Sequence, residues 1–236
     1  MKLIIFDCDG TLVDSQHMIC AAMQQAYEAH GLAVPPTEKL LSIVGLSLPD
    51  AFRRLAGLAE GGEHHPVDGL VTCYKTAFAA LRQSDQHLEP LYPGARAALD
   101  ALGRRPDMLL GIATGKSQRG VRAVLGRHGL SDRFATIQTA DDAPSKPHPG
   151  MVLAAMRETG VPPGDTMVVG DTVFDVEMAR AAGARAIGVG WGYHSAEALA
   201  AAGVDALIGD FSELAAALDR LWIATSAPEP MAATSL

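Results

Sequence analysis

The sequence contains few cysteines and no long apolar segment. Its three cysteines, Cys8, Cys20 and Cys73, form neither an even framework nor a C-x-x-C pair, which is typical of free thiols in a reducing compartment. No apolar run approaches the roughly 18 residues that a membrane span requires. The opening MKLIIF is interrupted at Asp7 before it reaches the length of a signal peptide. We therefore expect a cytoplasmic protein with no membrane partner.

Positive charge is also in deficit, since 19 Lys and Arg residues stand against 27 Asp and Glu residues and the formal net charge is −8. This balance argues against a nucleic-acid partner or an anionic membrane surface, where clustered Lys and Arg are expected. It does not argue against a small phosphorylated ligand, which needs only a few local cations. The hydrophobic fraction of 48% is too high for a disordered chain.

The hydrophobic pattern changes along the chain. The run KLIIF at 2–6 is short and apolar, which is typical of a buried strand. Between 16 and 88 only helical spacing is present, with helices expected from about 15 to 30, at 49–58 and at 66–83. From 95 onward helices and strands alternate. The strands are expected at 108–113, 134–138, 166–169, 185–189 and 205–208, and the helices at 95–102, 118–128, 150–159, 173–182, 196–201 and 211–221.

Strands that alternate with helices predict a parallel sheet covered on both faces. We therefore expect an α/β fold, with a Rossmann-like three-layer core and an all-helical cap subdomain inserted after the first strand. The core would comprise residues 1–15 and 89–223, the cap residues 16–88, and residues 224–236 would form a flexible tail.

Polar residues follow several of the expected strands, and ligands of such sheets bind beyond the carboxyl ends of the strands. Four carboxylates, a hydroxyl and a lysine would meet there: Asp7, Asp9, Asp171, Asp175, Thr114 and Lys146. Four carboxylates repel one another unless a cation offsets their charge. The four carboxylates would offer only oxygen ligands to such a cation, and oxygen ligands favour the hard cation Mg²⁺.

This set of residues indicates phosphoryl transfer through an aspartyl intermediate. Asp7, at a strand tip, could act as the nucleophile, and Asp9 could protonate a leaving alkoxide and later deprotonate water. Thr114 and the backbone N–H groups that open the next helix could hold phosphoryl oxygens. Lys146 would add positive charge, and Asp171 would share the metal with Asp7.

The sequence resembles a known family at these positions. The run DCDGTLVDS, the threonine after the second strand, the lysine of KPHP and the pair in GDTVFD resemble the haloacid dehalogenase superfamily of phosphatases. The helical insert resembles the subgroup with a small helical cap, which includes phosphoglycolate phosphatases. The resemblance extends from Lys2 to about Leu221.

The resemblance implies that Mg²⁺ is held by Asp7, the backbone carbonyl of Asp9 and Asp171, with Asp175 in support. It implies Asp7 as nucleophile and Asp9 as general acid/base. The expected phosphate-binding residues are Thr114, Gly115 and Lys146. The second motif reads TGKS, whereas many phosphoglycolate phosphatases have an asparagine after the threonine, so this departure weakens the substrate assignment.

Two other classes of protein fit less well. A P-loop would require glycine five residues before Gly115, where the chain has Leu110, and a dinucleotide-binding reading of GVGWGY fails because Tyr193 replaces the third glycine. A catalytically idle binding protein would be expected to lack at least one motif residue, and none is missing.

Within the enzyme class, the leaving group separates the alternatives. A dehalogenase has no alkoxide to protonate and does not need Asp9. A phosphonate hydrolase of this family would use a cap lysine, and Lys39 and Lys75 have no supporting motif. A sugar phosphomutase and a pyrophosphatase remain open. We expect a Mg²⁺-dependent phosphatase of a small phosphorylated metabolite, with 2-phosphoglycolate the leading candidate. We expect a monomer or homodimer whose specificity is set by the cap loop at 44–47.

Overall fold

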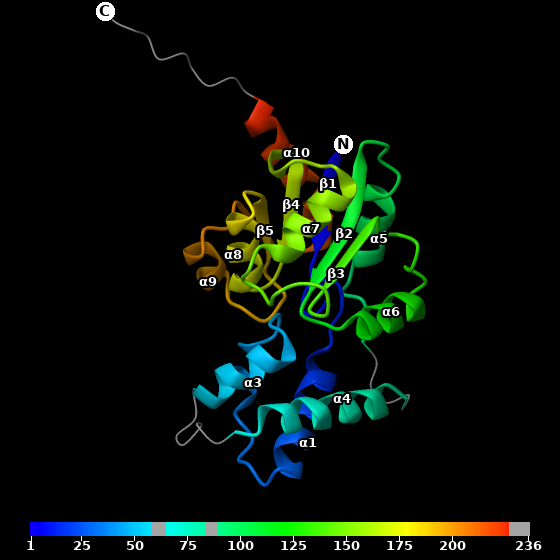
Figure 1. Ribbon diagram of the computed structural model, residues 1–236. Coiled ribbons are helices and arrows are strands. Elements are labelled where there is room, and N and C mark those ends of the chain that lie inside the picture. The colour runs from blue at the N-terminus through cyan, green and yellow to red at the C-terminus, as the bar shows by residue number, and fades with distance from the viewer. Residues whose placement is uncertain (58–64, 84–88, 227–236) are drawn as a thin grey trace, which may run out of the picture.

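The computed structural model describes residues 1–57, 65–83 and 89–226, and it contains a six-stranded parallel sheet with helices on both faces (Figure 1). The strands are β1 (Lys2–Phe6), β2 (Met108–Thr114), β3 (Thr136–Thr139), β4 (Thr166–Gly170), β5 (Arg185–Val189) and β6 (Ala206–Ile208). Their spatial order is β3-β2-β1-β4-β5-β6, and every neighbouring pair is parallel. The expected α/β fold is therefore confirmed.

The two faces of the sheet are buried by different helices. In β1, Ile4 and Phe6 belong to one apolar cluster and Leu3 and Ile5 to the other, because successive side chains of a strand point to opposite faces. The first face is covered by α5 (Ala95–Leu102), α6 (Gln118–Arg127) and α10 (Leu214–Ser226). The opposite face is covered by α7 (Gly150–Thr159), α8 (Val173–Ala181) and α9 (Ala196–Ala201).

Between β1 and α5, four helices in the described residues lie beyond the carboxyl end of β1 (Figure 1). They are α1 (Gln16–Ala29), α2 (Thr37–Leu41), α3 (Leu48–Gly57) and α4 (Val67–Gln83), and we call them the helical insert. The helical insert has an apolar core of its own, in which Tyr27, Phe52 and Phe78 are buried. Helix α2 was not expected, because its five residues are too few to show a helical period.

The remaining differences from the expected elements are small. The edge strands β3 and β6 begin slightly later than expected, since each has a neighbour on one side only. The segment Phe211–Glu213 is a 3₁₀ helix, because the side chain of Asp210 accepts a hydrogen bond from the Ser212 N–H at 2.7 Å and tightens the turn. Helix α10 then continues to Ser226, so the start of the expected tail is helical. Residues 227–236 lie outside the described part of the chain.

The strand order explains where the polar residues meet. From β1 the chain adds β2 and β3 on one side, whereas β4, β5 and β6 extend the other side. Such a change of direction opens a crevice beyond the carboxyl ends of the central strands, where α/β proteins bind their ligands. Phe6 of β1 pairs with Val169 of β4, so the residues that follow these two strands lie next to each other.

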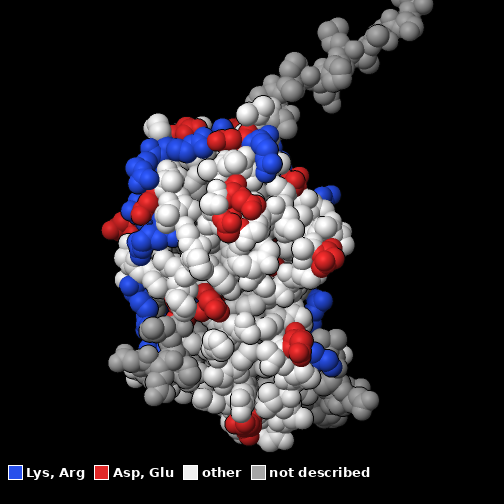
Figure 2. Space-filling view, turned by 180° about the vertical axis from the view of Figure 1, so that it is seen from behind, with Lys and Arg blue, Asp and Glu red and all other residues white. Residues whose placement is uncertain are grey.

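On the face in Figure 2, Lys and Arg side chains lie mainly along the top and the left edge, and several Asp and Glu side chains are scattered over otherwise uncharged surface. No helix in the described ranges is long and apolar enough to cross a membrane.

Candidate active site

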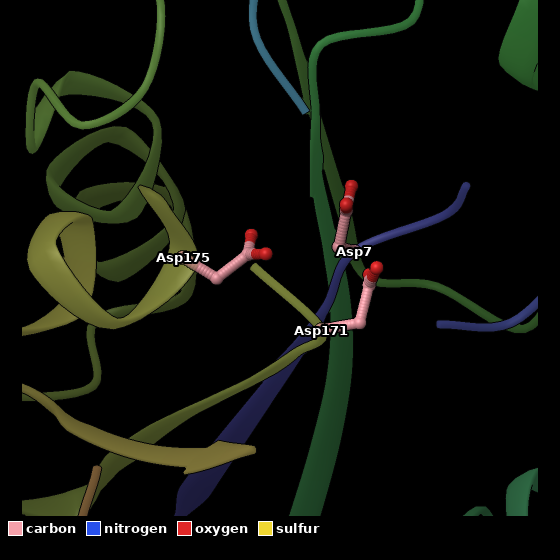
Figure 3. A group of neighbouring side chains, drawn as sticks. All are labelled: Asp7, Asp171 and Asp175. Atoms are coloured by element: carbon pink, nitrogen blue, oxygen red, sulfur yellow. The ribbon is translucent and has the colours of Figure 1, made fainter. Parts of the chain in front are cut away.

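Three buried carboxylates form the centre of the site. Asp7 follows β1, Asp171 follows β4, and Asp175 lies in the first turn of α8. Each offers an oxygen atom, and these atoms lie within 4.8 Å of one another. Figure 3 shows the side chains of Asp7 and Asp171 running side by side, with the carboxylate of Asp175 directed toward them from its helix. The structure therefore brings together three of the four carboxylates that the sequence placed at one sheet edge.

The three carboxylates differ in how their oxygens are used. Asp171 accepts hydrogen bonds on both oxygens, from the Thr11 hydroxyl at 2.7 Å and from the Tyr193 N–H at 2.9 Å. Asp175 is also fully engaged, with Lys146 on Oδ1 at 2.6 Å and the Thr172 hydroxyl and N–H on Oδ2. Its bonds to Thr172 form a capping box that begins α8.

Asp7 is the carboxylate that retains a free oxygen. Its Oδ1 lies 2.9 Å from Nζ of Lys146. Its Oδ2 is buried and has no hydrogen-bond partner among the described residues. A buried, unpartnered carboxylate oxygen is costly unless a ligand or cation engages it. Asp7 is therefore the carboxylate best placed to contact a metal ion or a reacting phosphorus.

The electrostatics of the cluster follow from its burial. Burial raises the pKa of Asp7 to about 7, against the opposing effect of Lys146 and with a further increase from Asp175. Burial, together with the charges of Asp175 and Asp7, raises the pKa of Asp171 well above its usual range. Three carboxylates thus share one ammonium group, and this excess of negative charge suits a divalent cation.

Lys146 is the cation of the cluster, and its side chain has no exposed surface. Burial alone would lower its pKa, but the neighbouring carboxylates of Asp175 and Asp7 outweigh this effect and raise the pKa above the usual range of lysine. Lys146 is therefore charged in the folded chain. Its position between Asp7 and Asp175 places positive charge beside the expected nucleophile.

The donor set fits a magnesium ion. Asp7 and Asp171 supply buried carboxylate oxygens, and the backbone carbonyl of Asp9 accepts no hydrogen bond within the described ranges. Mg²⁺ prefers such oxygen ligands and keeps several waters. Asp171 and Asp175 both accept hydrogen bonds on each oxygen, but only Asp175 is paired with the Lys146 ammonium, so we keep it in the supporting role that the resemblance implies. The ligand set itself remains a prediction.

Two glycines that the sequence reasoning did not select allow the chain to close around Asp171. A Cβ atom on Gly192 would lie 2.0 Å from Cβ of Asp171, and one on Gly10 would lie 2.3 Å from its Oδ2. Gly10 also has φ of +87°, which glycine adopts without strain. The glycine-rich run GVGWGY, considered only as a dinucleotide motif, thus forms a wall of the acidic site. Only its density of glycines could have indicated a close backbone approach.

The expected phosphate-binding residues lie at the end of β2. Thr114 is almost completely buried, and its hydroxyl accepts a hydrogen bond from the Lys116 N–H at 3.3 Å. Gly115 follows it directly and lies in the wall of a cavity together with Thr114. Thr114 and Gly115 line the same cavity as Asp7, whereas Lys146, from the loop between β3 and α7, contacts the Asp7 carboxylate.

The helix-opening N–H groups of α6 are less available than expected. The Gln118 N–H donates to a carboxylate oxygen of Asp141 at 2.8 Å, and the Gly120 N–H donates to the Ser117 hydroxyl at 3.3 Å. The expectation that the N–H groups opening this helix hold phosphoryl oxygens stays a prediction, in which Gln118 and Gly120 would first have to leave Asp141 and the N-cap.

Asp9 lies apart from the acidic triad and is held by two donors. Its Oδ1 accepts a hydrogen bond from the Ser15 hydroxyl at 2.6 Å and lies 2.9 Å from Nζ of Lys116. Burial alone would lower the pKa of Lys116, but Asp9 and Glu89 raise it above the usual range. Sequence reasoning missed Lys116 and Glu89. Their positions depend on contacts between segments that are far apart in the chain.

A cavity of about 480 Å³ lies between the carboxyl end of the sheet and the helical insert. Its lining includes Asp7, Asp9, Thr114 and Lys116 from the sheet edge and Leu46, Tyr74, Phe78 and Arg82 from the helical insert. A ligand in this cavity would contact both parts of the chain. This volume lies within the range that holds small molecules in proteins.

The loop at 44–47 approaches the sheet edge very closely. A Cβ atom on Gly115 would lie 2.5 Å from the carbonyl oxygen of Leu46 and 2.6 Å from that of Gly45. The Ser47 N–H donates to the Ser145 hydroxyl at 2.8 Å and fixes the loop in place. The departure in the motif TGKS thus has a structural reason, because any larger residue at 115 would displace this loop.

Comparison with known proteins identifies the family. The family model described as haloacid dehalogenase-like hydrolase matches residues 4–189, so the chain belongs to this family. A probable phosphatase, IndB, of Dickeya dadantii is 34% identical over 96% of this chain and 97% of its own length. The phosphoglycolate phosphatase of Chromobacterium violaceum is also 34% identical, over 91% of this chain and 95% of its own length.

Other relatives carry a different substrate name. The pyrophosphatase PpaX of Bacillus pumilus is 30% identical over 92% of this chain and 95% of its own length. Among solved structures, a hydrolase from Pseudomonas syringae has a TM-score of 0.80 and 26% identity, covering 93% of this chain and 99% of its own. The family and the enzyme class expected from the sequence, a hydrolase with phosphatase relatives, are therefore confirmed.

Proposed function

We propose that the protein is a Mg²⁺-dependent phosphatase that hydrolyses a small phosphorylated metabolite through an aspartyl-phosphate on Asp7. The observation that carries this proposal is the state of Asp7. It lies at the tip of a central strand, lines the cavity, contacts the Lys146 ammonium and keeps a buried oxygen without a partner. A carboxylate in this position can attack a phosphoryl group held in the cavity.

In the first step, an oxygen of Asp7 forms a bond to phosphorus while the bond from phosphorus to the leaving oxygen breaks. Asp9 gives its proton to that leaving oxygen, so the alcohol departs as a neutral molecule. Thr114 and Gly115 hold the phosphoryl oxygens from one side, and Lys146 stabilises the negative charge from the other. Asp7 then carries the phosphoryl group.

In the second step, Asp9 takes a proton from water. The oxygen of this water forms a bond to phosphorus, and the bond between phosphorus and Asp7 breaks. Asp7 is restored as a carboxylate and phosphate is released. The ion, when bound by Asp7, Asp171 and the Asp9 carbonyl, would supply positive charge that offsets the repulsion between these carboxylates and the phosphoryl oxygens.

The cavity favours a substrate with a second anionic group. Lys75 and Arg119 line it beyond the acidic site and have no ion-pair partner among the described residues. Cations in this position would stabilise a carboxylate or a second phosphate, but would gain little from an uncharged sugar. This supports 2-phosphoglycolate as the leading candidate and pyrophosphate as the principal alternative. A sugar phosphomutase is a further alternative, which would transfer the phosphoryl group instead of releasing it.

We propose further that residues 16–88 act as a cap on a core formed by residues 1–15 and 89–223. The separate apolar core of the helical insert and the contact of its loop at 44–47 with Gly115 support this division. A cap that closes over the substrate would exclude water from the reacting group and contribute to specificity.

The experiment that tests the proposed function is a phosphate-release assay on a panel of small phosphate compounds. The panel contains 2-phosphoglycolate, pyrophosphate, glycerol phosphate, hexose phosphates and p-nitrophenyl phosphate. We expect phosphate release with Mg²⁺, none in excess chelator, recovery when Mg²⁺ is restored, and none from Asp7→Asn. Full activity in excess chelator would contradict the metal dependence, and an active Asp7→Asn variant would contradict the role of Asp7.

A further inference from the structure

Lys116 lies between two carboxylates from distant parts of the chain. Its Nζ atom is 2.9 Å from Oδ1 of Asp9 and 3.1 Å from Oε1 of Glu89. The Lys116 side chain is only 8% exposed, and that of Glu89 only 2%. Taking such charges out of water is costly unless they are paired in a fixed geometry. The arrangement therefore holds Lys116 and both carboxylates in defined positions.

The same ion pairs continue into the helical insert. The other carboxylate oxygen of Glu89 lies 2.7 Å from Nη2 of Arg82, in the last turn of α4. The Phe78 ring, one turn earlier in α4, lies 5.0 Å from Lys116 Nζ and 5.0 Å from the Arg82 guanidinium carbon. A continuous series of charged contacts thus links Asp9 at the sheet edge to the helical insert, through Lys116, Glu89 and Arg82.

These contacts engage only one side of the Asp9 carboxylate. Ser15 and Lys116 both approach Oδ1, at 2.6 and 2.9 Å. No hydrogen bond engages Oδ2 in the described part of the chain. Asp9 also lines the cavity. The carboxylate is therefore fixed in orientation while its second oxygen stays available to a ligand.

We propose that Lys116 is a positioning residue for Asp9, and that Glu89 and Arg82 make this positioning depend on the docking of α4 against the sheet edge. The proposal rests on the proposed function, because it concerns the proton that Asp9 gives to the leaving group. Proton transfer requires donor and acceptor at hydrogen-bond distance, so a carboxylate free to rotate would transfer it less often.

A direct contact of Lys116 with the substrate is the competing explanation. Lys116 is already neutralised by two carboxylates. In contrast, Lys75 and Arg119 line the same cavity and have no ion-pair partner within the described ranges. Lys75 and Arg119 are therefore better suited to bind an anionic group of the substrate. This assigns Lys116 to the contact with Asp9.

The test uses the dependence of the reaction on its leaving group. We define R as kcat/KM for the alkyl phosphate that the wild-type chain hydrolyses fastest, divided by kcat/KM for p-nitrophenyl phosphate. An alkoxide needs a proton to depart, whereas nitrophenolate departs without one. A loss of proton transfer therefore lowers R, but a general loss of active protein lowers both rates and leaves R unchanged.

We expect Asp9→Asn to lower R by about 100-fold and Lys116→Met to lower it by about tenfold or more. Arg82→Met should lower R by a smaller factor. In an Asp9→Asn background, Lys116→Met should not change R further, because no acid remains to be positioned. Lys39→Met, which removes an exposed charge from α2, is the matched control and should leave R unchanged.

Three results would overturn the positioning role while leaving the proposed function intact. The first is an unchanged R in folded Lys116→Met. The second is a rise in KM of Lys116→Met for all substrates at constant R. The third is a decrease in R that Lys116→Met still causes when Asp9→Asn is already present. A wild-type chain that releases phosphate from no alkyl phosphate would instead overturn the proposed function itself. Should Lys116→Met fail to fold, Glu89→Gln keeps the shape of the side chain but not its charge. It should lower R by about threefold, and an unchanged R would again overturn the proposal.

Discussion

The ammonium group of Lys146 lies 2.9 Å from Oδ1 of Asp7, and neither side chain has any exposed surface. Asp7 follows β1, whereas Lys146 lies in the loop between β3 and α7, so the two residues are distant in sequence and meet at the carboxyl edge of the sheet. The pair matters for both folding and the proposed reaction. The Lys146 ammonium stabilises the buried carboxylate of Asp7, which is also the proposed nucleophile.

Removal of this cation should destabilise the chain strongly. Lys146→Met leaves Asp7, Asp171 and Asp175 buried together without a compensating charge. Breaking a buried ion pair on one side costs about 3–5 kcal/mol. We expect a loss of this size in the free energy of unfolding, measured with urea in the presence of chelator. Lys39→Met should change it by less than about 0.5 kcal/mol, and similar values for the two variants would contradict the importance of the pair.

Asp171→Asn should separate metal binding from folding. The variant keeps the shape of the side chain but removes one of three mutually repelling carboxylates, so the metal-free chain should gain thermal stability. Mg²⁺ should raise the melting temperature of the wild-type chain, because a ligand that binds only the folded state stabilises it. In Asp171→Asn this increase should be largely lost. An equal increase in both proteins would argue against Asp171 as a metal ligand.

The buried Asp7 should make the metal-free chain less stable as the pH rises. Burial raises its pKa from 3.8 to about 7, so between these values the folded chain holds a proton that the unfolded chain has released. The unfolded state then binds fewer protons, and the free energy of unfolding falls with increasing pH, by up to about 1.4 kcal/mol per pH unit.

The comparison with Asp7→Asn isolates this effect. With chelator present, the stability of the variant relative to wild type should increase from about pH 4 to pH 7 and then level off. Chemical unfolding at several pH values measures it. A difference that does not change with pH would contradict the raised pKa of Asp7.

Gly115→Ala should disturb the loop at 44–47. The added Cβ would meet the Leu46 and Gly45 carbonyl oxygens at 2.5 and 2.6 Å, so the loop must move away from the sheet edge. We expect kcat/KM to fall by about tenfold, which corresponds to about 1.4 kcal/mol. Gly126→Ala in α6, where a Cβ meets nothing within 4 Å, is the control and should keep full activity. Equal activities would argue against a closed loop as the active form.

The parts of the fold that were predictable are those with a strong local pattern. The alternation of strands and helices after residue 95 and the short apolar run of β1 indicated a parallel sheet, and the polar residues after its strands indicated a site at one edge. Helix α2 was missed because its five residues are too few to show the helical spacing of apolar residues. The hydrogen bond from the Gln118 N–H at the start of α6 to Asp141 could not be predicted, because Asp141 comes from another loop.

The site residues that were missed depend on tertiary contacts. Lys116 belongs to the motif TGKS, but no sequence pattern assigned it a role, and Glu89 has no motif around it. Their importance follows from the 3.1 Å contact between them and from the neighbouring Asp9. Gly115 looked like a departure from the family pattern, although its missing side chain makes room for Leu46. Contacts between loops of different origin leave little trace in a single sequence.

The most direct measurement of the central claim is the stereochemical course at phosphorus. A direct attack of water would displace the leaving group once and invert the configuration. A covalent phosphoryl group on Asp7 requires two displacements, and two inversions restore the starting configuration. A phosphorothioate ester made chiral with oxygen isotopes, hydrolysed in isotopically labelled water, reports this outcome in the released thiophosphate. We predict net retention, and net inversion would contradict Asp7 as the nucleophile.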